Sequence, residues 1–357
     1  MQHPSPIADR TPASAEDRPL KALVYRGQQG MVVEEVADPQ PAAGEVLVKV
    51  RYCGICGSDV HLFAKGVFFL GTTPGHEVSG EVLSLGPGVS GWQPGDRVVV
   101  KPSRTCGQCE YCLSSRPQLC LQPEGFGTGI RPGAFAHLLA THHNTLLRVP
   151  PGLDLAHAAL AEPLAVAVHA ADVSGIEAGQ AAVVTGAGPI GLLITEVLRE
   201  RGVQPIIVSE PSEPRRTLAA KLGPDHVVDP SAASLADLVR SQTGLGVHAV
   251  FECTGVPEAA NPALGLLRPG GTMLVVGHSD KSYTLSSLMV MAHELCIQGV
   301  FGSGGRFPTA LDLLAAGKVH CQDIITRIAP LSAAGACLRE LGDARGEGKV
   351  LIDPWAG

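Results

Sequence analysis

Four cysteines lie within fifteen residues of this sequence, in the stretch CGQCEYCLSSRPQLC. Two, two and seven residues separate them, so four thiolates on one short loop can close a tetrahedral zinc shell. Disulfides are disfavoured, because cysteines two residues apart would close small, strained rings. A redox CxxC pair needs two cysteines at a helix N-terminus, not four in a loop. We therefore predict a structural zinc held by Cys106, Cys109, Cys112 and Cys120.

A zinc ribbon for nucleic acid is a second interpretation of this cluster. Such ribbons usually join two separated CxxC knuckles among basic residues, whereas this cluster is contiguous and has only Arg104 and Arg116 nearby. The formal net charge of -7 also argues against nucleic acid or an anionic membrane as a partner. We expect neither partner.

A second set of possible metal ligands is spread along the chain. Cys56 lies in YCGICGSDVH, His76 and Glu77 lie in PGHEVSGE, and Glu162 lies in LAEPLAVAVHA. One thiolate, one imidazole and one or two carboxylates suit a catalytic zinc, which keeps one position open. Each residue also has an ordinary structural explanation. Glu162, for example, could simply start a helix, since Pro163 suits the first helical position.

A dinucleotide site is indicated by GAGPIG, which follows an apolar strand and opens an apolar helix. Its glycines allow a tight turn and let backbone N–H groups approach a pyrophosphate. Glu210 comes 24 residues after Gly186, where an acidic residue would bind the ribose hydroxyls and repel a 2′-phosphate. NAD is therefore favoured over NADP, although two arginines follow closely. The expected contacts are Gly186, Gly188, Pro189, Ile190, Gly191, Glu210 and Arg215.

The elements that must position these residues fall into two regions. Between about residues 21 and 150, short β-like runs alternate with turn residues, which predicts an antiparallel sheet or small barrel. Beyond Leu153, strands alternate with helices near 189–200, 213–222 and 258–267, which predicts a parallel, doubly wound sheet. After Phe301 we expect two more helical segments and a last strand, KVLID.

The bulk composition fits a two-domain globular protein. The chain has 357 residues, of which 45% are hydrophobic and 17% charged. No apolar run approaches the ~18 residues that span a membrane. Ten cysteines without an export signal indicate a reducing compartment, so we expect a cytoplasmic protein. Residues 1–20 lack an apolar core segment and are predicted to form a disordered leader.

In combination, these motifs resemble the zinc-dependent medium-chain alcohol dehydrogenase superfamily. The CGSDxH segment, the GHE segment, the four-cysteine lobe, the EP helix start and GAGPIG occur in the family's order, and the resemblance covers nearly all of residues 21–354. The polyol, threonine and secondary-alcohol dehydrogenases are closest in motifs. The resemblance implies an α/β fold, with a Rossmann domain at 163–302 and an antiparallel, GroES-like catalytic domain with a structural zinc lobe at 21–162 and 303–357.

The resemblance also implies a catalytic zinc, which makes two zincs per chain. Cys56, His76 and either Glu77 or Glu162 would be its ligands, because members of the family differ in which glutamate binds. Asp59 would orient the imidazole of His76, as outer partners of metal-bound histidines generally do.

The implied reaction moves a hydride from a secondary alcohol (a polyol, amino alcohol or cyclic alcohol) to NAD. Ser58 and His61 match the family's proton relay, and Thr254 and Val276 lie in loops that touch the cofactor. An NADPH-dependent zinc carbonyl reductase of the same fold is the alternative, and a non-catalytic zinc protein is a weaker one. A homodimer or homotetramer is expected from the resemblance alone.

One departure from the family puts the substrate in doubt. Polyol dehydrogenases usually carry an arginine and an aromatic residue before the last helices, where this chain has Gly302 and Ser303. Sorbitol-like specificity is therefore not expected to carry over.

Overall fold

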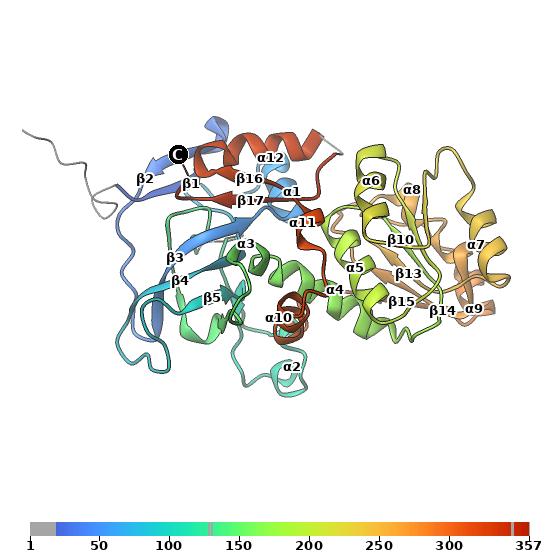
Figure 1. Ribbon diagram of the computed structural model, residues 1–357, viewed down its shortest axis with the longest axis horizontal. Coiled ribbons are helices and arrows are strands. Elements are labelled where there is room, and N and C mark those ends of the chain that lie inside the picture. Colours follow the sequence, from blue (N-terminus) through green and yellow to red (C-terminus); the bar gives the residue numbers. More distant parts are fainter. Residues whose placement is uncertain (1–18, 128, 130, 344–345, 357) are drawn as a thin grey trace, which may run out of the picture.

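The computed structural model describes residues 19–127, 129, 131–343 and 346–356, so nearly all of the predicted leader lies outside the described residues. Within them, two large sheets lie at opposite ends of the molecule, with α4 (Ala161–Ser174), α10 (Phe307–Ala315) and α11 (Cys321–Ile324) between them (Figure 1). None of the described helices combines the length and apolarity needed to cross a bilayer.

The first sheet is antiparallel except for one parallel pair at its edge. Its order is β16-β17-β3-β4-β5-β9, with β8 also paired to β3, and β16 and β17 form the parallel pair. Val46, Val48 and Val50 of β3 are fully buried, because a strand places alternate residues on one face. The strands are β3 (Glu45–Gly54), β4 (Glu77–Leu85), β5 (Arg97–Val100), β8 (Leu138–His142), β9 (Leu146–Arg148), β16 (Ile325–Pro330) and β17 (Lys349–Asp353); β1 (Lys21–Tyr25) and β2 (Met31–Glu35) form a separate hairpin.

The second sheet is parallel, as the alternation of strands and helices predicts. Its order is β12-β11-β10-β13-β14-β15, so the chain starts in the middle and winds outward in both directions. The predicted doubly wound fold is thereby confirmed. The strands are β10 (Ala182–Thr185), β11 (Ile206–Ser209), β12 (His226–Val228), β13 (Val247–Glu252), β14 (Leu267–Val275) and β15 (Cys296–Gly299).

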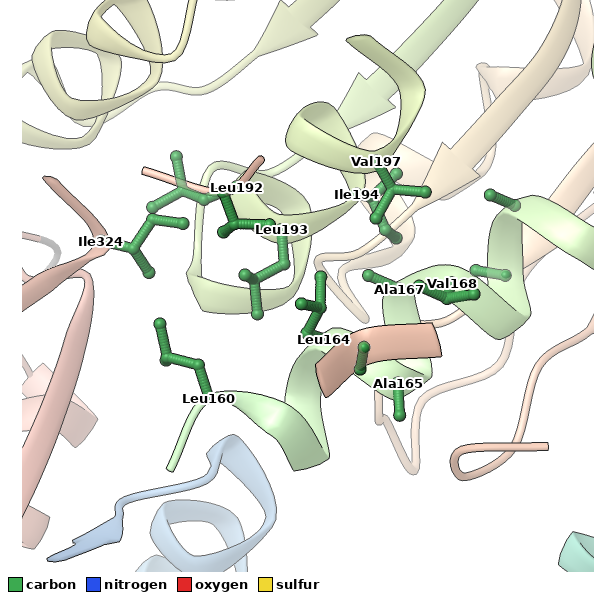
Figure 2. Packing of buried hydrophobic residues seen from close by; sticks show 14 of the residues in the cluster. Leu160, Leu164, Ala165, Ala167, Val168, Leu192, Leu193, Ile194, Val197 and Ile324 are labelled. Atoms are coloured by element: carbon green, nitrogen blue, oxygen red, sulfur yellow. The ribbon is translucent and has the colours of Figure 1, made fainter. Parts of the chain in front are cut away.

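The two sheets are joined through packed helices. Leu160 and Leu164, at the start of α4, lie in one buried cluster with Leu192 and Leu193 of α5 (Pro189–Glu200), as Figure 2 shows. The helix that carries Glu162 is therefore fixed against the helix that the glycine motif opens. The other helices of the described chain are α1 (Gly57–Lys65), α2 (Glu110–Leu113), α3 (Leu155–Ala158), α6 (Glu213–Lys221), α7 (Leu235–Thr243), α8 (Pro257–Ala260), α9 (Ser287–Ala292) and α12 (Ala334–Asp343).

Two expectations about the elements are wrong. The helix expected over 258–267 is interrupted, because Pro262 has no N–H to continue the α8 ladder; a 3₁₀ turn (Ala263–Leu266) follows, and β14 begins at Leu267. The segment after Phe301 holds a strand, β16, that the sequence pattern did not predict. The last strand, β17, pairs with β3 and so brings the C-terminal chain into the first sheet. The exact domain bounds stay a prediction.

Candidate active site and zinc centres

The four-cysteine lobe is a compact cluster of donors. The Sγ atoms of Cys106, Cys109, Cys112 and Cys120 lie within 4.8 Å of one another, and all four cysteines are free of disulfides. Backbone N–H groups of Leu121 and Cys112 lower the pKa of Cys109 to about 6, whereas burial and the neighbouring thiols raise the pKa of Cys112 to about 11. Four thiolates this close repel one another unless a cation neutralises them. The donor set fits a closed zinc site.

The second constellation forms where β3 ends and β4 begins. Cys56 caps the N-terminus of α1, and its backbone N–H donates to Asp59 Oδ2 at 3.0 Å. The other carboxylate oxygen of Asp59 lies 3.5 Å from Nδ1 of His76, and neither of these two buried atoms has a hydrogen-bond partner. Burial would lower the pKa of His76, yet the negative charges of Asp59 and Cys56 raise it well above its usual value. This surplus of negative charge is what a divalent cation would balance.

The two candidate glutamates have different surroundings. Glu77 is buried and both of its carboxylate oxygens accept from Lys349 Nζ, at 2.6 and 2.7 Å. The same ammonium donates to the carbonyl oxygen of Ile55 at 2.9 Å. Burial would lower the pKa of Lys349, but the charges of Glu77, Cys56 and Glu162 raise it above its ordinary value. Glu77 is thus held by a cation of the protein itself.

Glu162 is the carboxylate without such a clamp. It lies on the first turn of α4 and is only 8% exposed. Burial raises its pKa to about 7, while the neighbouring charges of His76 and Lys349 act in the opposite direction. A buried carboxyl of this kind needs a cationic partner to remain ionised, and a metal beside His76 would supply one. Cys56, His76 and Glu162 have the donor types of a zinc site with an open position, but among the described residues only the four-cysteine lobe has its ligand atoms within 4.8 Å of one another.

The expected relay residues lie on the helix that Cys56 caps. Ser58 is at its first turn and His61 one turn further, since both belong to α1. The ring of His61 packs edge to face against His278, with the centroids 4.6 Å apart. Sequence reasoning did not single out His278, which follows the predicted cofactor loop at Val276.

The glycine motif has the backbone geometry that a dinucleotide requires. Gly186 has a φ of +89°, which glycine adopts without strain, and α5 starts at Pro189 with Gly188 as its N-cap. A Cβ on Gly191 would overlap the carbonyl oxygen of Gly186, so only glycine lets α5 approach the strand this closely. Ile190, in the first turn, packs partly buried against the core.

Glu210 lies beside this motif at the carboxyl end of β11. Its Oε2 accepts from the N–H of Ala187 and its Oε1 from the N–H of Ser212, both at 2.8 Å. Each carboxylate oxygen keeps a further lone pair for a ribose hydroxyl. Arg216 donates to the carbonyl oxygen of Glu210 at 3.0 Å, and Arg215 Nε donates to the carbonyl oxygen of Glu347 at 3.3 Å.

A buried carboxylate that the sequence did not reveal holds the two loops that are predicted to contact the cofactor. Glu252, at the end of β13, is fully buried and its Oε1 accepts from the N–H groups of Thr254 (2.8 Å) and Gly255 (3.0 Å) and from the Thr254 hydroxyl. Its Oε2 accepts from the Tyr283 hydroxyl at 2.9 Å, and its carbonyl oxygen from the N–H of Val276 at 2.9 Å. Thr254 and Val276 are therefore held by one residue. Apolar strands that end in an acidic residue are common, so the sequence offered no distinguishing signal.

Arg306 is an arginine shortly after Gly302 and Ser303 in the sequence, but it lies away from the candidate zinc site. Its Nε pairs with Asp172, near the C-terminal end of α4, ten residues after Glu162. At ~1.5 Å per residue, this places the pair about 15 Å along the helix from the glutamate. Arg306 does not replace the arginine of the polyol dehydrogenases.

Two family models match the chain. The model for the alcohol dehydrogenase GroES-like domain matches residues 42–151, and the model for zinc-binding dehydrogenases matches residues 189–316. The first range lies in the half of the antiparallel sheet and the second in the half of the parallel sheet.

Similar proteins are found over most of the chain. L-threonine 3-dehydrogenase from Thermococcus kodakarensis is 36% identical, over 83% of this chain and 87% of that protein. Sorbitol dehydrogenase from Halalkalibacterium halodurans is 35% identical, over 86% of this chain and 92% of that protein. A crystal structure of a zinc-binding dehydrogenase from Sinorhizobium meliloti, bound to NADP, superposes with a TM-score of 0.88 at 32% identity, over 95% of this chain and 100% of that chain.

Proposed function

This chain belongs to the zinc-dependent medium-chain alcohol dehydrogenase superfamily and is an oxidoreductase that acts on CH–OH groups, and we propose that its substrate is a small secondary alcohol oxidised with NAD. One observation carries this proposal. Burial raises the pKa of Glu162 while the charge of His76 lowers it, and Glu162 lies on a helix that packs against the helix of the cofactor motif. A zinc ion held by these residues and the nicotinamide of a bound cofactor could therefore lie next to each other.

Glu162, with Cys56 and His76, is the proposed set of catalytic zinc ligands. Glu77 is excluded from this set in our proposal because Lys349 neutralises its carboxylate from within the protein. A bound zinc would supply a Lewis acid that lowers the pKa of the substrate hydroxyl. Asp59, beside the imidazole of His76, would keep that ring in the orientation needed for binding.

The protein groups then handle the proton and orient the reactants. Ser58 would accept the hydroxyl proton of the alcohol while its own proton passes to the unprotonated nitrogen of His61, which releases it to solvent. Glu252 would hold the loops of Thr254 and Val276 so that the nicotinamide faces the carbinol carbon. NAD, when bound, accepts the hydride.

The choice of NAD rests on Glu210. A carboxylate fixed beside the glycine motif by two backbone N–H groups would repel the 2′-phosphate of NADP. The NADP bound to the similar protein from Sinorhizobium meliloti favours the alternative, in which the enzyme reduces carbonyls with NADPH. The ratio of kcat/KM for NAD and NADP distinguishes the two proposals.

The substrate class follows from the relatives and from one difference. L-threonine 3-dehydrogenase and sorbitol dehydrogenase, by name, act on an amino alcohol and a polyol. Because Gly302 and Ser303 stand where polyol dehydrogenases carry an arginine and an aromatic residue, we favour an amino or cyclic alcohol over sorbitol. The free cysteines support a reducing compartment, the cytoplasm.

We also propose a homo-oligomer that is built on the edge of the parallel sheet. All four residues of β15 are exposed, and Leu288 and Met291 on the adjacent α9 are 66% and 68% exposed. An exposed apolar edge strand is a template for pairing with another chain. A second copy related by a two-fold axis would cover it.

The test measures zinc per chain by elemental analysis together with turnover of L-threonine, sorbitol and cyclohexanol. We expect two zincs in the wild type and one in Cys56→Ala, which should lose turnover on every alcohol and keep NADH binding. Cys53→Ala is the matched control, because Cys53 is buried in the apolar core three residues earlier and should keep both zincs. One zinc in both the wild type and Cys56→Ala would overturn the proposal.

A further inference from the structure

Two histidines from opposite halves of the molecule contact each other beside the proposed relay. His61 projects from α1, in the half that carries the proposed zinc ligands, and His278 lies in the loop that follows β14 of the parallel sheet. Their ring centroids are 4.6 Å apart and the ring planes meet at 81°. Edge-to-face ring pairs of this kind restrict the rotation of both side chains.

An ion pair reinforces the same junction. Lys65, one turn after His61 on α1, pairs with Asp280, two residues after His278. The side chains of Lys65 and Asp280 are 38% and 61% exposed, so the ion pair contributes little energy by itself. It shows that α1 and the segment after His278 face each other at this point as well.

The buried Glu252 holds the loop that carries His278 through hydrogen bonds to neighbouring backbone groups. A Cβ on Gly255 would meet the carbonyl oxygen of His278 at 2.5 Å, which shows how closely the two backbones pack. The N–H of Gly255 donates to Glu252 Oε1, and the N–H of Gly277 donates to the carbonyl oxygen of Glu252 at 2.8 Å. The same carboxylate holds Thr254, so His278 and the predicted cofactor loop share one support.

Among the described residues, three charged or titratable groups act on the pKa of His61. Burial lowers the pKa of His61, and the neighbouring His278 and Lys65 lower it further, while Asp280 acts in the opposite direction. The helix α12 packs against α1 through Val60, close to Gly342, and its Glu340 is paired with Arg327 at 2.9 Å. The lowered pKa of His61 favours the neutral imidazole, the form that can accept a proton.

We propose that His278 is a positioning residue for the relay: its ring holds His61 in place, and it does so only while α1 is docked on the loop of the nucleotide-binding half. The proposal rests on the proposed function, in which His61 receives the proton from Ser58. Proton transfer is thereby tied to the arrangement in which the cofactor loop and the zinc site face each other. A relay that is complete only in this arrangement prevents deprotonation of the alcohol where no hydride acceptor can lie.

The test uses the full-length, zinc-loaded protein and the alcohol of the three above that is oxidised fastest. His61→Asn should lower kcat by roughly a hundredfold. His278→Ala should lower kcat by about tenfold with little change in KM, since the relay base remains but is no longer held. His278→Phe keeps a ring against His61 without a titratable group and should restore most of the lost kcat. Lys65→Met is the control: it removes the ion pair between α1 and the loop after β14 but keeps the contact of the two histidine rings, so it should keep kcat within about twofold.

NMR titration of the histidine rings supplies a readout that needs no substrate. In His278→Ala the pKa of His61 should rise toward its ordinary value, because both burial and a neighbouring ring are lost. NADH binding, followed by fluorescence, shows that each variant is folded. If His61→Asn keeps full kcat, the relay of the proposed function is wrong. If His61→Asn loses activity but His278→Ala does not, or if Lys65→Met loses as much as His278→Ala, the role of His278 is overturned.

Discussion

Lys349 carries the positive charge that lies among the buried carboxylates of the candidate zinc site. Its side chain is 2% exposed, and its ammonium donates to Glu77 and to the carbonyl oxygen of Ile55. Removing one partner of a buried ion pair leaves the other charge uncompensated. We therefore expect Lys349→Met to lower the free energy of unfolding by roughly 3–5 kcal/mol, measured by urea denaturation.

The double variant Lys349→Met, Glu77→Gln tests the reason for this loss. It removes both charges, so it should recover part of the stability that the single variant loses. A single variant that costs less than about 1 kcal/mol would mean that the pair behaves like an exposed one.

The two glutamates are distinguished by one matched pair of variants. Glu162→Gln should reduce the zinc content from two ions per chain to one, because the amide is a poor ligand and no protein cation replaces the metal. Glu77→Gln should keep both zincs, since its carbonyl oxygen can still accept from Lys349. Elemental analysis after dialysis against a weak chelator measures both. The reverse pattern would make Glu77 the ligand.

Two glycines of the GAGPIG motif are required for different reasons: Gly191 for the packing of α5 and Gly188 for cofactor binding. A Cβ on Gly191 would overlap the carbonyl of Gly186, whereas a Cβ on Gly188 meets no other atom within 4 Å. Gly191→Ala should therefore destabilise the fold by about 1–3 kcal/mol, as overpacking does. Gly188→Ala should leave the Tm unchanged and weaken NADH binding, because its Cβ would stand where the pyrophosphate approaches. Calorimetry and NADH fluorescence separate the two effects. Equal losses of Tm would contradict the geometry.

Elements with strong local signals could be predicted from the sequence. The helix expected over 189–200 is the observed α5, because Pro189 suits its first position and its apolar period is regular. The nine-residue α1 was not predicted, since its cap depends on Asp59 accepting from the Cys56 N–H. The short β15 has no buried face and so gives no alternation to detect.

Across the whole molecule, the parts that could not be predicted depend on contacts between distant residues. The motifs identified Cys56, His76 and Glu162 as candidate zinc ligands. The pairing of Glu77 with Lys349 could not be predicted, because these residues are 272 positions apart. The contact of His61 with His278 likewise forms only when α1 meets the loop after β14. Sequence periodicity describes each element separately and carries no information about contacts between residues that are far apart in the sequence.

The exposed edge of the parallel sheet allows a test of the assembly. In a two-fold dimer, β15 of one copy would pair with β15 of the other, so Ile297→Lys would bring two like charges together at the axis. We expect this variant to change from twice the chain mass to once the chain mass in light scattering after size exclusion. Leu245→Lys is the matched control, because Leu245 is 69% exposed in the loop between α7 and β13 and should leave the mass unchanged. A monomeric wild type would overturn the proposed homo-oligomer, and an Ile297→Lys variant that stays dimeric would show that the dimer is built on another surface.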